Sequence, residues 1–269
     1  MPSRYMPEPA PDEPGRRAGP VAALRLALST FTVLPVPTGR VDRDTARGAM
    51  ALAPAVGAAL GAVLAGLALL LRLAGAPVGV LAVVVVLGAV LATRALHLDG
   101  LADTVDALGA YADRQRALDI MKRSDIGPFG VVALVLVLAA QVAAVVAVGD
   151  RPPLALLATL VTAAGTGRLA VTFACRRGVP AARPEGLGAL VAGTVPVPLV
   201  LAGALPLAAV GLAADPHRPW LGSLAVLLGL AAAALLVRHV TRRLGGITGD
   251  VLGACVELSG TVALAALSC

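Results

Sequence analysis

Residues 78–106 read VGVLAVVVVLGAVLATRALHLDGLADTVD, and this stretch decides the fold. Its first part, 78–98, is apolar almost throughout and is long enough to cross the roughly 30 Å of hydrocarbon in a bilayer. Its second part begins at His97 and places three aspartates directly behind the apolar run. Because carboxylates at a membrane are costly unless they have a use, the stretch predicts a membrane protein with its chemistry at the edge of the bilayer.

The composition of the chain supports the same prediction. Of the 269 residues, 58% are hydrophobic and 14% are charged, against about half and about a quarter in soluble domains. Alternating strands of the outer-membrane-barrel kind do not occur in the sequence. We therefore expect an all-α, polytopic integral membrane helical bundle of about seven spans, preceded by an interfacial helix within 21–35. The expected spans are 49–71, 78–98, 129–148, 154–174, 188–213, 220–238 and 249–268.

The ends of the chain differ in character. Residues 1–20 are rich in Pro, Arg and Glu, and they lack the apolar core of a signal peptide. They predict a disordered cytoplasmic tail, whereas 21–269 is expected to form a single membrane-embedded catalytic domain. The net charge of +6 comes without aromatic interleaving or a nucleic-acid-binding motif, so no nucleic-acid partner is expected.

Seven spans place the loops alternately on two sides of the membrane, and the basic residues divide very unequally between them. All but three of the 22 lysines and arginines fall on one side; the exceptions are Arg72, Arg151 and Arg218. The positive-inside rule places the basic side in the cytoplasm. Every candidate reactive group lies on that same side, which favours an enzyme with a cytoplasmic substrate over a transport pathway.

The first acidic cluster consists of Asp99, Asp103 and Asp106. Positions i, i+4 and i+7 lie within about 60° of one another on a helix, so the three carboxylates share a face. Oxygen ligands favour a hard cation, Mg²⁺ before Zn²⁺, and Mg²⁺ usually arrives with substrate phosphates. The alternative is an amphipathic helix whose acidic side simply faces water.

A second acidic pair, Asp250 and Glu257, lies near the end of the chain. The two are seven residues apart and therefore share a helix face on an expected span, where carboxylates are functional by default. The preceding glycines, Gly245 and Gly246, offer free N–H groups at a helix start, which suits a phosphate. Two acidic clusters can share Mg²⁺ over a diphosphate. In the alternative interpretation, Glu257 only pairs with an arginine of another helix.

Five stretches, in order, resemble the adenosylcobinamide-GDP ribazoletransferase family, also called cobalamin synthase. One departure concerns the third stretch, where many members have Asp-Ser-Arg and this chain has Arg-Ser-Asp at 123–125. The stretches are FTVLPVP at 31–37, HLDGLADTVD at 97–106, MKRSDIGPFG at 121–130, ARPEGLG at 182–188 and GITGDVLGACVE at 246–257.

The resemblance implies the last steps of cobalamin biosynthesis in a bacterial plasma (inner) membrane, with Mg²⁺ as cofactor. A ribose hydroxyl of α-ribazole, or of its 5′-phosphate, attacks the cobinamide-side phosphate of adenosylcobinamide-GDP, and GMP leaves. The residue roles implied are metal binding by Asp99, Asp103, Asp106 and Asp250, catalysis by Asp103, Asp250, Glu257 and His97, and substrate binding by Lys122, Arg123, Ser124, Arg168 and Arg183. His97 lies on the helix face opposite the aspartates, so a structural role for it is equally compatible with the pattern.

Three other functions deserve comparison. A CDP-alcohol phosphatidyltransferase and a membrane prenyltransferase also place carboxylates on membrane helices, but their spacings differ from those seen here. A transporter of a corrinoid or metal ion is disfavoured by the one-sided charges and by the lack of internal repeats. The sequence leaves open the number of metal ions, the general base, the choice between ribazole and its phosphate, the lower-ligand base and whether a homo-oligomer forms.

Overall fold

The computed structural model describes residues 19–39, 41–123 and 125–269. The expected tail lies almost wholly outside these residues, as does Ser124. The described residues are all-helical, with helices at α1 (Pro20–Phe31), α2 (Arg43–Leu73), α3 (Val78–Ala92), α4 (Leu96–Gly109), α5 (Arg114–Ile120), α6 (Pro128–Val148), α7 (Pro153–Ala174), α8 (Gly186–Val191), α9 (Val197–Gly211), α10 (Trp220–Leu244) and α11 (Gly249–Ser268). The expected all-α membrane bundle is confirmed, and α1 is the short apolar helix expected before the first span.

Five helices of the described chain, α2, α6, α7, α10 and α11, are long and apolar enough to cross a membrane, and α3 with α4 makes a sixth if that bent pair is one span. The expectation of about seven spans is therefore too high by this measure. The difference lies in 188–213, where backbone at 192–196 separates the short helix α8 from α9. Pro196 precedes α9, and proline disfavours helix in the residue before it. The 15 residues of α9 form too short a helix to count as a span.

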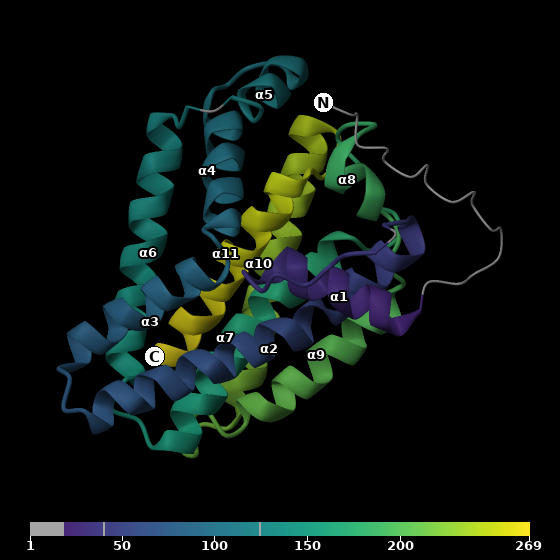
Figure 1. Cartoon of the computed structure of the whole chain (residues 1–269). Coiled ribbons are helices and arrows are strands. Elements are labelled where there is room, and N and C mark those ends of the chain that lie inside the picture. The colour runs from purple at the N-terminus through teal and green to yellow at the C-terminus, as the bar shows by residue number, and fades with distance from the viewer. Residues whose placement is uncertain (1–18, 40, 124) are drawn as a thin grey trace, which may run out of the picture.

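The apolar run and the acidic stretch that follow one another in the sequence form two helices instead of one. Between α3 and α4 the chain turns by 87°. Arg94 and Ala95 have φ of 53° and 56°, a left-handed conformation that ends a right-handed helix. As a result, α4 leaves the axis of α3 and packs against α11 (Figure 1).

The centre of the bundle is α7, which packs against α2, α9, α10 and α11. The α2–α7 contact depends on Gly57, where an added Cβ would lie 2.5 Å from the carbonyl oxygen of Ala164. Small residues allow such close helix approach where lipid, unlike water, gives no hydrophobic drive for helices to associate. Dispersion contacts between closely packed helices therefore carry much of the stability of this bundle.

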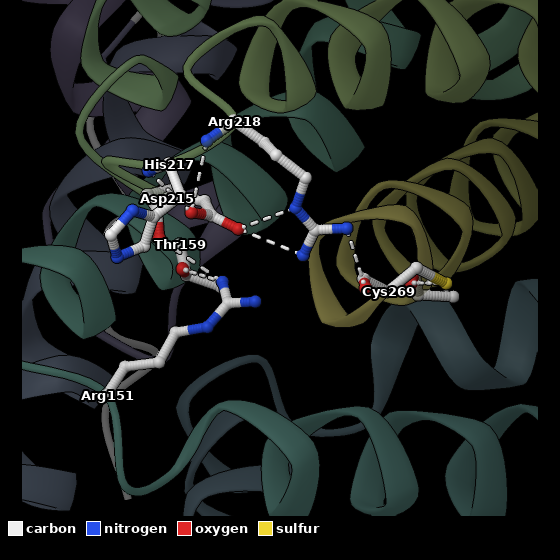
Figure 2. A network of polar contacts seen from close by, with 8 residues as sticks. Arg151, Thr159, Asp215, His217, Arg218 and Cys269 are labelled. Atoms are coloured by element: carbon white, nitrogen blue, oxygen red, sulfur yellow. Dashed lines mark hydrogen bonds and ion pairs between the residues drawn. The ribbon is translucent and has the colours of Figure 1, made fainter.

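The two ends of the bundle are defined by contacts between loops. At one end, Arg72 donates to the carbonyls of Gly149 and Arg151, and Arg218 donates to the carbonyl of Cys269 (Figure 2). At the other end lie α4, α5, α8 and the first turn of α11 (Figure 1). We call the first the arginine-tied end and the second the acidic end. The three arginines that the sequence places apart from the others thus all lie at one end of the structure.

Candidate active site

The site is built on a direct backbone contact between α4 and α11. At Gly100 an added Cβ would lie 2.6 Å from the carbonyl oxygen of Asp250, and at Gly253 it would lie 3.1 Å from the Cα of His97. Each glycine thus receives the backbone of the other helix, and neither position has room for a side chain. The contact brings the HLDGLADTVD stretch of α4 against the GDVLG start of α11, although about 150 residues separate them in the chain.

Three carboxylates and one guanidinium gather around this contact. The carboxylate of Asp103 is close enough to those of Asp99 and Asp250 to be repelled by both, and more weakly by Asp106, while Arg183 attracts it. Arg183 also attracts Asp250. Asp99 is exposed, whereas Asp103 and Asp250 are partly buried. The expected meeting of the two acidic clusters is therefore found for these three aspartates, and such a concentration of negative charge calls for a cation.

Arg183 reaches this position because its segment is paired with the start of α11. Ala182 N–H donates to the carbonyl of Ile247 at 3.0 Å, and Ile247 N–H donates to that of Pro180 at 2.9 Å. The Arg183 Nη2 donates to the carbonyl of Leu118 at 2.6 Å, while its buried Nε has no partner among the described residues. A guanidinium has five N–H donors, so Arg183 has donors left for an anion.

The start of α11 holds Asp250 in a fixed place. Thr248 is the N-cap of the helix, and its hydroxyl accepts from Val251 N–H and donates to Asp250 Oδ2 at 3.2 Å. A carboxylate in the first turn is also favoured by the helix dipole. The Asp250 side chain is therefore oriented by its neighbours before any ligand binds.

Three cavities meet at these residues. A mostly apolar cavity of about 140 Å³ lies under Asp99 and Asp250, with Phe31, His97 and Leu252 in its wall. A second cavity, of about 250 Å³, contains Arg183, Gly188 and Asp250. The third and largest, about 490 Å³, is lined by polar side chains: Arg114, Gln115, Asp119, Lys122, Arg183 and Glu185. Asp250 is shared by the first two cavities and Arg183 by the last two, so the three form a continuous series.

The donor set fits a metal ion that is bound together with substrate. Among the described residues, no three acidic, His or Cys side chains converge tightly enough to hold a metal by themselves. Mg²⁺, however, is usually held by one or two carboxylates together with substrate phosphates and water. Asp99, Asp103 and Asp250 can supply such ligands, which fits a metal carried in by a diphosphate better than a resident ion.

Comparison with known proteins now decides the family. The family model of cobalamin-5-phosphate synthase matches residues 23–268. The chain belongs to this family. Relatives named adenosylcobinamide-GDP ribazoletransferase include those of Nocardioides sp., 46% identical over 88% of this chain and 94% of the relative, of Frankia casuarinae, 42% identical over 89% and 92%, and of Halorubrum lacusprofundi, 37% identical over 91% and 95%. No solved structure matches the chain.

The third aspartate of the family-like stretch, Asp106, has a different task from the one expected. It is buried, and its Oδ2 and Oδ1 accept hydrogen bonds from the backbone N–H groups of Gly127 and Gly130 at 2.8 and 2.9 Å. These N–H groups belong to the first turn of α6, which has no other side-chain cap. Asp106 therefore has a capping role that the sequence did not predict, and the expectation that it binds metal stays a prediction.

Glu257 and Arg168 are also placed apart from the acidic site of this cobalamin-5-phosphate synthase family member. Both line a separate cavity between α2, α3, α6, α7 and α11. Glu257 is two turns beyond Asp250 on α11 and accepts from Gln141 Nε2 at 2.9 Å. Arg168 and Glu257 thus lie with each other and apart from the aspartates. The expected catalytic role of Glu257 and the expected substrate contact of Arg168 stay predictions. Gln141 was missed, although a lone amide in the apolar sequence of α6 was a visible signal.

The remaining expected residues fall at the edges of the site. His97 is buried, and its ring stacks on Phe31 with 6.0 Å between ring centroids. Lys122 is exposed in the wall of the largest of these cavities, 3.5 Å from Glu185, and Arg123 is also exposed. Arg114 was not expected; its Nη2 donates to the carbonyl of Ala182 at 3.0 Å. In the sequence, Arg114 is marked only by following Asp113, a typical N-cap residue that does cap α5.

Proposed function

We propose that this chain is an adenosylcobinamide-GDP ribazoletransferase that works in cobalamin biosynthesis as a multi-pass membrane enzyme. The observation that carries the proposal is the contact of α4 with α11, which gathers Asp99, Asp103 and Asp250 beside Arg183. Relatives that share this name match the chain over nearly its whole length. The chemistry of the site and the name of the relatives point to the same reaction class, transfer at a diphosphate.

The reaction exchanges one phosphate–oxygen bond for another. The ribose hydroxyl of α-ribazole, or of its 5′-phosphate, forms a bond to the cobinamide-side phosphorus, and the bond from that phosphorus to the bridging oxygen breaks, so that GMP leaves with the bridging oxygen. The hydroxyl proton must be taken up by a base. The orientation of Asp250 by Thr248 and its position in the wall of two cavities support it as this base.

The substrate groups are assigned to the cavities by chemistry. The polar cavity of about 490 Å³, with Arg114, Lys122 and Arg183 in its wall, suits the guanine nucleotide. Arg183, between that cavity and Asp250, suits the phosphates, because guanidinium groups bind phosphate oxygens in pairs. The apolar cavity under His97 suits the aromatic base of the attacking nucleoside.

Magnesium is the proposed cofactor, held by Asp99, Asp103 and Asp250. When bound, it would neutralise charge on the diphosphate and on the departing GMP. The carboxylates of the chain repel one another without it, and this repulsion favours uptake of a cation together with the anionic substrate. Asp106 is left out of this proposal because its oxygens cap α6.

The acidic end is proposed to face the cytoplasm of a bacterial plasma membrane. All but three of the 22 basic residues fall on that side of the expected topology, and the three exceptions lie together at the other end. The positive-inside rule supports this orientation. Cysteine labelling at Arg116→Cys, on α5, tests it: we expect protection from an impermeant reagent in intact cells and reaction after lysis.

The decisive assay uses purified protein in lipid vesicles with adenosylcobinamide-GDP, α-ribazole and Mg²⁺. We expect adenosylcobalamin and GMP in equal amounts, and the 5′-phosphate of α-ribazole as a parallel acceptor separates the two substrates. A CDP-alcohol phosphatidyltransferase would instead release CMP from a CDP-alcohol, and a transporter would release no nucleotide. Absence of GMP, with an active relative as positive control, would refute the proposal.

A further inference from the structure

A second polar site lies in the membrane-spanning part of the bundle, apart from the aspartates. It is a cavity of about 90 Å³ whose wall is apolar except for Arg168 on α7, Gln141 on α6 and Glu257 on α11. Glu257 lies seven residues beyond Asp250, which places it about 10 Å deeper along α11. Charged groups at such depth are costly and are kept where they serve a purpose.

Arg168 has no hydrogen-bond partner among the described residues. Its side chain is buried, with 8% of its surface exposed, and the Nε is both buried and unpartnered. Space for the side chain comes from Gly57 of α2, where an added Cβ would lie 2.9 Å from the Arg168 Cδ. A buried guanidinium without acceptors is destabilising by several kcal/mol. The packing nevertheless makes room for it and turns it into the cavity.

Glu257 faces the same cavity and attracts Arg168. One carboxylate oxygen accepts from Gln141, whose Nε2 also donates to Thr261 Oγ1 at 2.9 Å. In the described part of the chain, no hydrogen bond or ion pair joins Arg168 to Glu257 directly. This differs from the partly buried pair Arg218 and Asp215 at the arginine-tied end, whose side-chain atoms approach to 2.9 Å. The cavity therefore separates two opposite charges that a purely structural ion pair would bring together.

The charge balance limits what can fill the gap. An anion would be attracted by Arg168 but repelled by Glu257. A cation would be attracted by Glu257 but repelled by Arg168. A neutral group that both accepts and donates hydrogen bonds satisfies both side chains and leaves no surplus charge in the bilayer. We propose that this cavity is a binding site for a neutral carboxamide or hydroxyl group carried by a larger molecule.

The size of the cavity favours an arm or end of a ligand over a whole one. Sites for complete small molecules usually have several hundred Å³, whereas this cavity has about 90 Å³. Two sources can present the required chemistry: a carboxamide arm of the corrinoid substrate, which rests on the proposed function, or the hydroxyl of a membrane lipid. The donor and acceptor geometry is common to both.

The test removes both charges together. In the double variant Arg168→Met/Glu257→Met, apolar side chains of similar length replace the pair, and such replacements of buried ion pairs are often neutral or stabilising. We expect the melting temperature in vesicles to be kept. If the ligand is a substrate arm, KM for adenosylcobinamide-GDP rises about 10- to 100-fold, as expected for lost charge-assisted hydrogen bonds, with a smaller change in kcat.

The lipid source is tested with phosphatidylcholine vesicles that do or do not contain dioleoylglycerol, a lipid with one neutral hydroxyl. If this source is correct, dioleoylglycerol raises the melting temperature of the wild type and not that of the double variant. The lipid measurement needs no turnover. If the wild type forms no GMP, the proposed function fails, and the dioleoylglycerol measurement alone then tests the binding site.

A second variant keeps both charges and fills the space. Ala89→Leu adds carbons in the cavity wall, whereas Ala140→Leu, next to Gln141 on the exposed face of α6, is its matched control. If the double variant does not fold, Ala89→Leu decides: a raised KM or a lost response to dioleoylglycerol, absent in the control, supports the site. Unchanged KM and unchanged lipid response in a folded double variant, or in Ala89→Leu where the double variant fails to fold, overturn it.

Discussion

Arg183 at the acidic end is used differently from the three arginines of the arginine-tied end. At the arginine-tied end, Arg72, Arg151 and Arg218 each donate to loop carbonyls or to the C-terminal residue, and Figure 2 shows Arg218 held between Asp215 and Cys269. At the acidic end, Arg183 gives one hydrogen bond to a carbonyl and keeps its buried Nε unpartnered beside three aspartates. Arginines fasten loops at both ends, and Arg114 does so at the acidic end, but Arg183 keeps donors available beside the aspartates.

Arginines can be present to set the orientation of the protein in the membrane or to bind a ligand, and a count of charges does not distinguish the two. The excess of basic residues on one side of the membrane reports orientation, but it says nothing about which arginine binds a ligand. What identifies Arg183 is unsatisfied hydrogen-bonding capacity next to a cavity, because a buried donor without a partner is costly unless a ligand supplies one. The predictions below test this contrast, from the largest expected effect to the smallest.

Asp103→Asn is expected to lower kcat by about 100-fold or more, because it removes one of the carboxylates proposed to hold Mg²⁺ at the diphosphate. Folding should be unaffected, since Asp103 caps no helix in the described structure. Asp215→Asn, at the arginine-tied end, is the matched control and should keep wild-type turnover. Steady-state formation of GMP in vesicles measures both variants. Near-normal turnover of Asp103→Asn would remove this residue from the mechanism.

Gly100→Ala is expected to reduce turnover by about 10- to 100-fold, the scale associated with displacements of about 1 Å in an active site. The added Cβ would lie 2.6 Å from the carbonyl oxygen of Asp250 and would push α4 away from α11. The control is Gly66→Ala on α2, where nothing lies within 4 Å of the new Cβ. Equal activity of the two variants would show that the close contact does not position the aspartates.

Arg183→Lys keeps the charge but loses the planar pair of donors. We expect KM for adenosylcobinamide-GDP to rise about 10-fold, as for loss of one charge-assisted hydrogen bond, with a smaller change in KM for α-ribazole. The same exchange at the other end, Arg218→Lys, should leave both KM values unchanged. A rise in KM for α-ribazole alone would move Arg183 to the acceptor side of the reaction.

Asp106→Asn should lower stability by about 1 kcal/mol, the usual effect of weakening a helix cap. The amide oxygen of asparagine can still accept a hydrogen bond from one of the two N–H groups, of Gly127 or Gly130. The amide NH₂ then faces the other N–H group and cannot accept from it. Thermal unfolding in detergent measures the loss. If Asp106 were a metal ligand instead, the variant would keep its melting temperature and show a raised Mg²⁺ requirement for turnover.

Arg218→Gln should shift the melting temperature by no more than a few degrees, since pairs at the surface contribute little. Loss of solvent raises the pKa of Asp215. Hydrogen bonds from the His217 N–H and from the Arg218 guanidinium outweigh this effect and hold the pKa of Asp215 below its usual range. The contribution of this contact is therefore present at neutral pH and disappears as the pH falls through that lowered pKa. A difference between variant and wild type that persists in acid would contradict this.

The sequence predicted the class of fold and the central contact well, for physical reasons. Long apolar runs have few structural options other than helices that cross a membrane. Carboxylates such as Asp99 and Asp250 are too costly at a bilayer to occur without a use, so their sequence positions pointed to the site. Both predictions depend on the free energy of placing apolar or charged side chains in a bilayer, which is large and is set by the local sequence.

Other features could not be predicted, because they depend on packing between distant segments. Helical spacing put Asp106 on the same face as Asp103, but the bend at Arg94 and the approach of α6 gave it two backbone N–H groups to cap. Helical spacing also put Glu257 on the face of Asp250, yet α11 continues past the α4 contact into a separate cavity. Periodicity tells which way a side chain points, not which neighbour receives it.

The double acceptance by Asp106 has a consequence for how this site can vary. One carboxylate clamps the last turns of α4 to the first turn of α6, so the intervening residues 110–126 leave and return at a single fixed point. That excursion carries α5, including Arg114, and the Lys122 segment that walls the large polar cavity. A change within this segment would therefore reshape the wall of the polar cavity, while the contact of α4 with α11 keeps Asp99, Asp103 and Asp250 in place.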